Sequence, residues 1–152
     1  MRGTRYCYIL KVRSFGLNWL FLSFSLLCFH SVCYSQTLYN DSNMLIGRIE
    51  SDGFVYNRSN MTIGRFKSDG WIVDRSNITI GRIMSDGRIV DRSNMTIGKV
   101  EGDGFVKDRN NMTIGRVKPD GYVLDKSNMI IGRAKDVPFA YVAVFFLFTL
   151  FE

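Results

Sequence analysis

The chain has 152 residues, of which 20 are Lys or Arg and 14 are Asp or Glu, and its formal net charge is +6. Four of the basic residues, all three cysteines and the single histidine lie within residues 1–35, which contain no acidic residue. Without this segment, 16 basic residues stand against 14 acidic ones and neither His nor Cys is left. This composition argues against nucleic-acid binding, the usual zinc sites and catalysis by His or Cys.

Residues 1–35 have the pattern of a secretory signal peptide. A basic start is followed by a short apolar run over 17–27 and by Cys33-Tyr34-Ser35, which places small residues before a cut ahead of Gln36. The apolar run is shorter than the roughly 20 residues of a spanning helix, so a cleaved leader is favoured over an uncleaved anchor. We therefore expect an exported protein that is periplasmic, secreted or on the outer surface.

Residues 36–135 are organised by a 17-residue repeat. Its copies begin, without any insertion, at Ser42, Ser59, Ser76, Ser93, Asn110 and Ser127. A constant short period indicates a repeat architecture. Asp-Gly recurs five times between apolar and β-branched residues and is expected to supply the positive φ angles of a tight hairpin turn. The Ser-Asn pair is a second turn signal. Two turns per copy leave two short strands, for example Met61 to Lys67 and Trp71 to Arg75.

Three series of equivalent positions are predicted to face the core, because β-branched and other apolar side chains suit a half-buried pleated surface. They are Ile46, Ile63, Ile80, Ile97, Ile114 and Ile131; Val55, Ile72, Ile89, Val106 and Val123; and Met44, Met61, Ile78, Met95, Met112 and Met129. Two other series vary in kind and are expected to be partly exposed. They are Phe54, Trp71, Arg88, Phe105 and Tyr122, and Tyr56, Val73, Val90, Lys107 and Leu124.

Each copy also carries a glycine inside its first strand, at Gly47, Gly64, Gly81, Gly98, Gly115 and Gly132. A repeated strand glycine indicates a bulge, a bend or a close backbone approach, with a glycine-lined ligand site as the alternative.

Charged residues repeat as well. One basic series begins at Arg48 and another at Arg58, and Asp74, Asp91, Asp108 and Asp125 stand beside the second series. Surface ion pairs between neighbouring units are the simpler interpretation, and a basic ring that gathers an anionic ligand is the alternative.

Half a repeat unit stands at each end of the domain, over 37–41 and 129–135. Pairing these halves would close a ring and remove its exposed edges. The predicted fold class is therefore all-β, with 17-residue β-hairpin repeats arranged radially as a closed pseudo-symmetric ring. Six Ser/Asn-Asn turns and five Asp-Gly turns leave the choice between five and six petals open.

The third segment, 136–152, breaks the period. Residues 137–151 carry no charge and are too few for a spanning helix. Asp136 could cap a helix with Pro138 in its first turn. We expect this segment to complete the core inside the ring or across its mouth, with membrane docking and subunit association as alternatives.

The repeated Ser-Asn-Met-Thr-Ile-Gly-Arg…Ser-Asp-Gly…Val-Asp-Arg phrase, the leader and the Phe-rich end 145–148 together resemble the five-fold beta-flower proteins, small secreted bacterial repeat proteins. The resemblance covers essentially all of 36–152. It implies petal-like hairpins around a pseudo-symmetry axis, and it implies no activity and no functional residues.

The function expected from the sequence is a non-enzymatic exported scaffold or binding module, without catalytic, cofactor-binding or metal-binding residues. Its candidate binding surface is the exposed aromatic series Phe54, Trp71, Phe105 and Tyr122, which could stack on sugars or on side chains of another envelope protein. The simpler interpretation is that these rings cover strand faces. The alternative function is a membrane-associated or oligomeric structural protein that acts through the apolar tail at 137–151.

Overall fold

The computed structural model describes residues 36–151, so the predicted signal peptide at 1–35 lies outside the described residues. The described chain forms twelve strands and one helix. The strands are β1 (Gln36–Asn40), β2 (Leu45–Ile49), β3 (Phe54–Asn57), β4 (Thr62–Phe66), β5 (Trp71–Asp74), β6 (Thr79–Ile83), β7 (Arg88–Asp91), β8 (Thr96–Val100), β9 (Phe105–Asp108), β10 (Thr113–Val117), β11 (Tyr122–Asp125) and β12 (Ile130–Ala134), and the helix is α1 (Phe139–Phe146).

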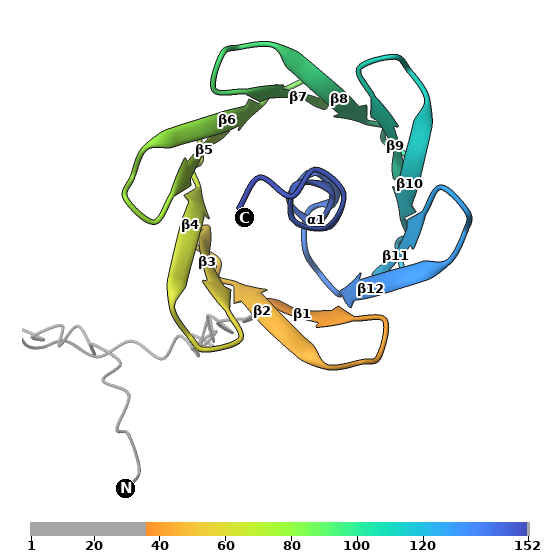
Figure 1. The fold of residues 1–152 in the computed structure, drawn as a ribbon, viewed down its shortest axis with the longest axis horizontal. Coiled ribbons are helices and arrows are strands. Elements are labelled where there is room, and N and C mark those ends of the chain that lie inside the picture. The colour runs from red at the N-terminus through yellow and green to blue at the C-terminus, as the bar shows by residue number, and fades with distance from the viewer. Residues whose placement is uncertain (1–35, 152) are drawn as a thin grey trace, which may run out of the picture. The chain divides into compact units, whose positions relative to one another are not determined.

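The strands form one closed antiparallel barrel in which each strand pairs with its neighbours in the sequence. The barrel closes where β1 pairs with β12, with Leu38 opposite Ala134 and Asn40 opposite Gly132. Figure 1 shows the closed ring with α1 at its centre. The expected all-β closed ring with an apolar C-terminal segment in its core is therefore confirmed. Because residues 36–134 leave no strand edge unpaired and 137–151 pack inside, this part of the chain supplies its own sheet and its own core.

Both kinds of turn have the same geometry, that of a three-residue hairpin loop. In one, Gly70 N donates to Lys67 O at 3.0 Å, and in the other Asn77 N donates to Asp74 O at 3.0 Å. Gly70 has a φ of 87° and Asn77 a φ of 62°. Only the glycine of each Asp-Gly pair is among the positive-φ residues of the described chain, so the expectation that the pair supplies several such angles was wrong. A type I turn followed by one left-handed residue needs only one positive φ angle.

The predicted core is correct for two series of the three. Val55, Ile72, Ile89, Val106 and Val123 are all fully buried. The Ile46 series is half-buried and packs against the core. The Met44 series was assigned wrongly, because its side chains are 49–66% exposed. Each of its members directly precedes a strand, at the rim of the barrel, where no layer of structure lies beyond it.

A further inward series was not singled out from the sequence. Ile49, Phe66, Ile83, Val100, Val117 and Ala134 all belong to the core or pack against it. Each lies two residues after a strand glycine, so the period of two along a strand could have found it.

Val73 and Val90 are buried, whereas the sequence predicted partial exposure. Neither belongs to the core cluster. Val73 is paired with Arg65 and Thr79 on the two neighbouring strands, and Val90 is placed equivalently. We attribute their burial to the long arginine side chains beside them on the outer face of the barrel, Arg65 for Val73 and Arg82 for Val90.

The strand glycines lie at β-bulges. Leu38 is paired with Gly47 and Tyr39 with Leu45, so Ile46 is the extra residue of β2. Every second strand pair has a register shift at the equivalent place. A Cβ on Gly81 would lie 2.6 Å from the carbonyl oxygen of Val90, which is closer than real contacts allow. The prediction of a bulge with close backbone approach is thus confirmed.

Each strand glycine also faces one side chain of the C-terminal segment. A Cβ on the glycine would lie within 4 Å of that side chain in every case. The pairs are Gly47 with Phe145, Gly64 with Phe151, Gly81 with Leu150, Gly98 with Phe148, Gly115 with Leu147 and Gly132 with Phe146. The space that the alternative ligand site would have used is therefore filled by the protein's own tail.

The helix α1 begins at Phe139, with Pro138 as its N-cap residue and no side-chain cap. Asp136 has a φ of 60° and does not cap the helix, so that expectation was wrong. The Pro138 carbonyl instead accepts from the N–H groups of Tyr141 and Val142. Val142, Ala143 and Val144 are fully buried. The helix thus lies along the barrel axis as part of the core.

Candidate functional site

The barrel has two different ends, because consecutive turns alternate between the two kinds. We call them the Asn end, with turns at Asn43, Asn60, Asn77, Asn94, Asn111 and Asn128, and the Asp-Gly end, with turns at Gly53, Gly70, Gly87, Gly104 and Gly121. The helix begins near the Asp-Gly end, where Phe139 and Ala140 line a hollow with Gly87. The tail finishes near the Asn end, where Leu150 and Phe151 line a hollow with Arg75. The C-terminal segment therefore runs from one end of the barrel to the other.

Exposed apolar side chains gather at the Asn end. In residues 36–151, nine large hydrophobic side chains are exposed, and Trp71 alone among them lies outside this end. The other eight are Met44, Leu45, Met61, Ile78, Met95, Met112, Met129 and Ile130. Together with the half-buried Leu150 and Phe151, these eight residues form what we call the Asn-end face. Each of the eight lies beside one of the Asn turns, so the exposed apolar side chains are distributed around one end of the barrel.

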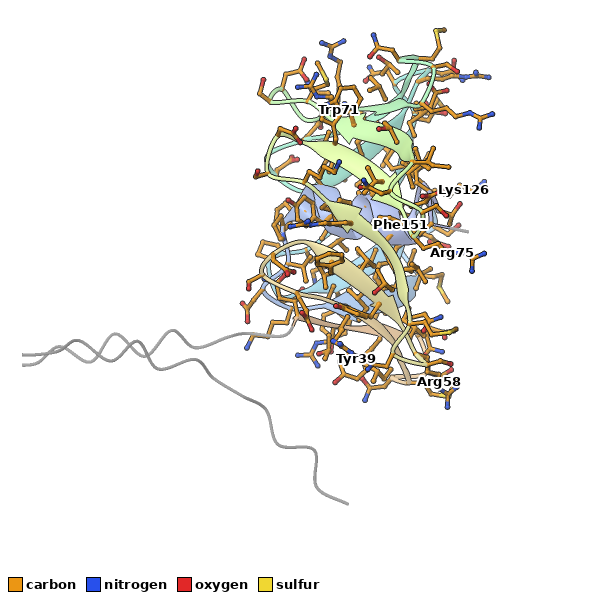
Figure 2. The ribbon with its side chains drawn as sticks, turned by 90° about the vertical axis from the view of Figure 1, so that its left-hand side faces the viewer. Tyr39, Arg58, Trp71, Arg75, Lys126 and Phe151 are labelled. Atoms are coloured by element: carbon orange, nitrogen blue, oxygen red, sulfur yellow. The ribbon has the colours of Figure 1, made fainter. Side chains whose placement is uncertain are left out.

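The same end carries a ring of exposed basic residues, one in each Asn turn after the first. These are Arg58, Arg75, Arg92, Arg109 and Lys126. Asp41 occupies the equivalent position in the first turn. Arg58, Arg75 and Lys126 lie along the same edge of the barrel in Figure 2, and Phe151 lies toward that edge. Within the described part of the chain, none of the five donates a hydrogen bond or forms an ion pair.

The aspartates beside this basic ring do not form the ion pairs that the sequence suggested. The Oδ1 atom of Asp74 accepts from the backbone N–H of Ser76 at 2.8 Å and of Ile78 at 2.9 Å. Asp91, Asp108 and Asp125 repeat this pattern, and Asn57 bonds Met61 in the same way. These half-buried carboxylates hold the turn, while the basic side chains beside them project into solvent. A short polar side chain that bonds its own turn accounts for the repeated Asp or Asn.

The Asp-Gly end carries the opposite exposed charge. Asp52, Asp69, Asp86, Asp103 and Asp120 are all exposed, as is Asp136. The hydrogen bond from Arg88 lowers the pKa of Asp86, and the hydrogen bond from Lys118 lowers the pKa of Asp120. Both carboxylates are therefore ionised at neutral pH. Among exposed charged side chains, the Asn end thus has five cations and Asp41, and the rest of the barrel has these six aspartates and three cations, Arg88, Lys99 and Lys135. The half-buried aspartates of the Asn turns balance the cations beside them, so the two ends differ in exposed charge and not in total charge.

A family model described as 5-fold beta-flower protein matches residues 35–150. The chain belongs to the 5-fold beta-flower family. The match covers all twelve strands and α1, and it bears out the resemblance drawn from the repeat. The comparisons found no matching curated protein and no matching solved structure.

The aromatic side chains singled out from the sequence lie one to a unit on the outer wall of the beta-flower barrel. The guanidinium carbon of Arg65 lies 4.4 Å from the Phe54 ring centroid, and that of Arg82 lies 4.7 Å from the Trp71 ring. Arg116 covers Phe105 at 4.4 Å, and Arg133 lies 5.3 Å from Tyr122. These rings come from β3, β5, β9 and β11, so the fold does not bring them together. Each ring already has a cation near it, and a cation–π contact of this kind contributes about 0.5–1 kcal/mol of attraction at an exposed site.

Two further findings concern metal binding and membrane-spanning helices in the described part of the beta-flower barrel. In the part of the chain that the structure describes, no group of three or more acidic, His or Cys residues is placed to hold a metal ion. No helix of residues 36–151 has the length and hydrophobicity needed to cross a membrane. The distinctive surface of the described chain is therefore the Asn-end face with its basic ring. Sequence reasoning missed it because the methionines were assigned to the core.

Proposed function

We propose that the protein is a non-enzymatic exported binding module that docks through its Asn-end face on an apolar, negatively charged surface of the cell envelope. One observation carries this proposal: eight of the nine exposed large hydrophobic side chains of residues 36–151 lie at one end of the barrel. Scattered over the surface, such side chains would need no explanation. Gathered at one end and ringed by cations, they favour a partner that is both apolar and anionic.

We infer that the barrel is built of six petals, each a pair of strands joined by an Asn turn. Support comes from the tail, which gives one side chain to the glycine of each pair. Followed round the ring from Gly64 on β4 to Gly132 on β12 and then Gly47 on β2, the facing residues are 151, 150, 148, 147, 146 and 145. The tail therefore turns once around the axis and skips only Thr149, which is exposed.

The alternative function, membrane association or oligomerisation through a free tail at 137–151, has less support. Val142, Ala143 and Val144 are fully buried in the barrel, so the tail is not available as a separate anchor. Its last residues instead contribute to the Asn-end face. Export, to the periplasm, the outer surface or the medium, rests on the sequence pattern of residues 1–35.

Methionine oxidation would test the docking face, because the chain contains its own control. Met61, Met95 and Met112 lie at the Asn end, whereas Met84 lies at the Asp-Gly end, where its carbonyl accepts from Gly87. The extent of peroxide oxidation at each methionine would be compared by mass spectrometry between the purified protein and the protein in intact cells. We expect protection in cells at the Asn-end methionines and no change at Met84. Equal oxidation of all four in the two samples would contradict the proposal.

A further inference from the structure

We propose that the surface on which the Asn-end face docks is an anionic phospholipid bilayer, with the apolar rim entering the interface and the basic ring lying at the level of the headgroups. This inference rests on the proposed function and names its partner. It is drawn from three features of the described chain: the placement of the basic residues, the chemistry of the rim and the charge of the opposite end.

A basic side chain and an apolar one lie three residues apart in each Asn turn after the first. Arg75 and Ile78 are three residues apart in a loop closed by the hydrogen bond from Asn77 to Asp74. The same spacing holds for Arg92 with Met95 and for Arg109 with Met112. A long cationic side chain beside an apolar one is the arrangement found at membrane interfaces, where the charge stays with the headgroups and the apolar group lies deeper.

The fold already provides partners for backbone polar groups of the Asn turns, as one turn shows. The carboxylate of Asp91 accepts the N–H groups of Ser93 and Met95, and the turn carbonyl accepts from Asn94. The apolar side chains of the Asn-end face therefore offer thioether and aliphatic groups, while the free hydrogen-bonding groups at this end belong to the basic ring and to the exposed Ser and Asn side chains of the turns. Methionine is flexible and adapts to irregular partners. A fluid bilayer matches this combination, because its headgroup phosphates accept from basic side chains and its interior takes up apolar groups in any arrangement.

The charge distribution disfavours a second copy of the chain and favours a bilayer. Two Asn-end faces in contact would bring two basic rings together, and like charges in apposition are unfavourable. An anionic surface attracts Arg58, Arg75, Arg92, Arg109 and Lys126 at one end, and it repels the exposed aspartates at the other. The field of the membrane thus orients the barrel with its apolar face inward.

Vesicle co-sedimentation of the chain from Gln36 to Glu152 would test this proposal, since residues 36–151 contain the complete barrel and its core. The vesicles are phosphatidylcholine alone and an equimolar mixture of phosphatidylcholine and phosphatidylglycerol. We expect binding to the mixed vesicles, little binding to phosphatidylcholine alone, and release at high salt because surface charges are then screened.

Two double variants with the same change in net charge distinguish an effect of the Asn-end cations on binding from an effect of the net charge of the protein. Arg92→Gln with Arg109→Gln removes two cations from the Asn end, and we expect the partition coefficient to fall by about 10- to 30-fold. Arg88→Gln with Lys135→Gln removes two cations from the Asp-Gly end and should leave partitioning within about twofold of the parent, because that end faces away from the membrane. Equal losses in both variants would overturn the proposal, since binding would then follow net charge alone.

A second pair of variants tests the apolar rim. Met95→Ser with Met112→Ser should weaken binding by about tenfold, because less apolar area enters the interface. Met84→Ser at the other end is the control and should have no effect. Melting temperatures of all variants establish that each one is folded. Unchanged binding of the rim variant would overturn the proposal.

The wild-type result distinguishes this proposal from the one it rests on. If the parent chain binds neither vesicle while its Asn-end methionines are protected in cells, docking stands and the lipid partner is wrong. If the parent chain sediments as a dimer with these methionines protected in the absence of lipid, the occupant of the face is a second copy. If no protection is seen in cells, the docking function itself fails.

Discussion

Gly115 on β10 and Leu147 at the end of α1 lie so close that a Cβ on the glycine would stand 2.9 Å from both Leu147 methyl carbons. The same Cβ would also collide with the carbonyl oxygen of Leu124 on the neighbouring strand. The glycine is therefore required twice, once by the bulge and once by the tail. Because each of the six strand glycines faces a side chain of the tail, the size of the barrel interior is matched to the tail that fills it.

Replacing a strand glycine by alanine should destabilise the protein. Gly98→Ala would place a methyl group against the Lys107 carbonyl and the Phe148 ring, and overpacking of this kind costs about 1–3 kcal/mol or more. Gly102→Ala is the matched control, since nothing lies within 4 Å of its added Cβ, and it should be neutral or slightly stabilising. Urea unfolding of both variants measures the difference. Similar stabilities would show that the contact between glycine and tail is not maintained in solution.

Truncation after Lys135 should yield an unfolded or aggregating product, while the chain from Gln36 to Glu152 remains soluble without detergent. The deletion removes the fully buried Val142, Ala143 and Val144, together with all the side chains that face the strand glycines. Each large apolar side chain buried contributes about 1.5–3 kcal/mol at most, so the loss exceeds the stability of an ordinary domain. Size-exclusion chromatography and thermal melts test this. A monomeric truncated protein with an unchanged melting temperature would refute the role of the tail as core.

Two residues that the sequence assigned to the core, each from a different series, should respond very differently to replacement by alanine. Ile89 is fully buried, and Ile89→Ala should cost about 2–5 kcal/mol. Met95 is 66% exposed, and Met95→Ala should change the free energy of unfolding by no more than about 0.5 kcal/mol. Equal costs in urea melts would mean that the rim is buried in the solution state, for instance by self-association.

The carboxylate of Asp86 should titrate below the ordinary range of an aspartate. Arg88 Nε donates to Asp86 Oδ2 at 2.6 Å, which favours the ionised form and lowers the pKa. Because the folded-state pKa is lowered, any stability from this pair is present above the unfolded pKa and is lost as the pH falls through the folded one. Arg88→Met should raise the pKa of Asp86 and leave that of Asp120, which is bonded to Lys118, unchanged. Carbon NMR titration of the carboxyl groups would show this, and a pKa of Asp86 that does not respond would contradict it.

Much of this fold could be predicted from local chemistry. The positions of the Asn and Asp-Gly turns follow from backbone preferences of single residues, since Asn77 and Gly70 tolerate the left-handed region. The fully buried series of Ile72 and Ile89 follows from its constant β-branched character. Closure of the ring follows from the half-units at the two ends, because unpaired strand edges are unfavourable. These features depend on short stretches of chain or on the repeat itself, and both are visible in the sequence.

The candidate site, by contrast, depends on what lies next to each side chain in space. Met95 and Ile89 are both apolar members of the repeat, and only the barrel shows that Met95 is at an uncovered rim and Ile89 in the core. The contact between Gly64 and Phe151 joins residues far apart in the sequence, so no local pattern predicts it. The separation of exposed charge also appears only in the fold, because strand direction sends Arg92 to one end and Asp86 to the other. Backbone preference thus determined the turns and strands, while the tail packing and the two unlike ends were decided by closure of the barrel around its own C-terminal segment.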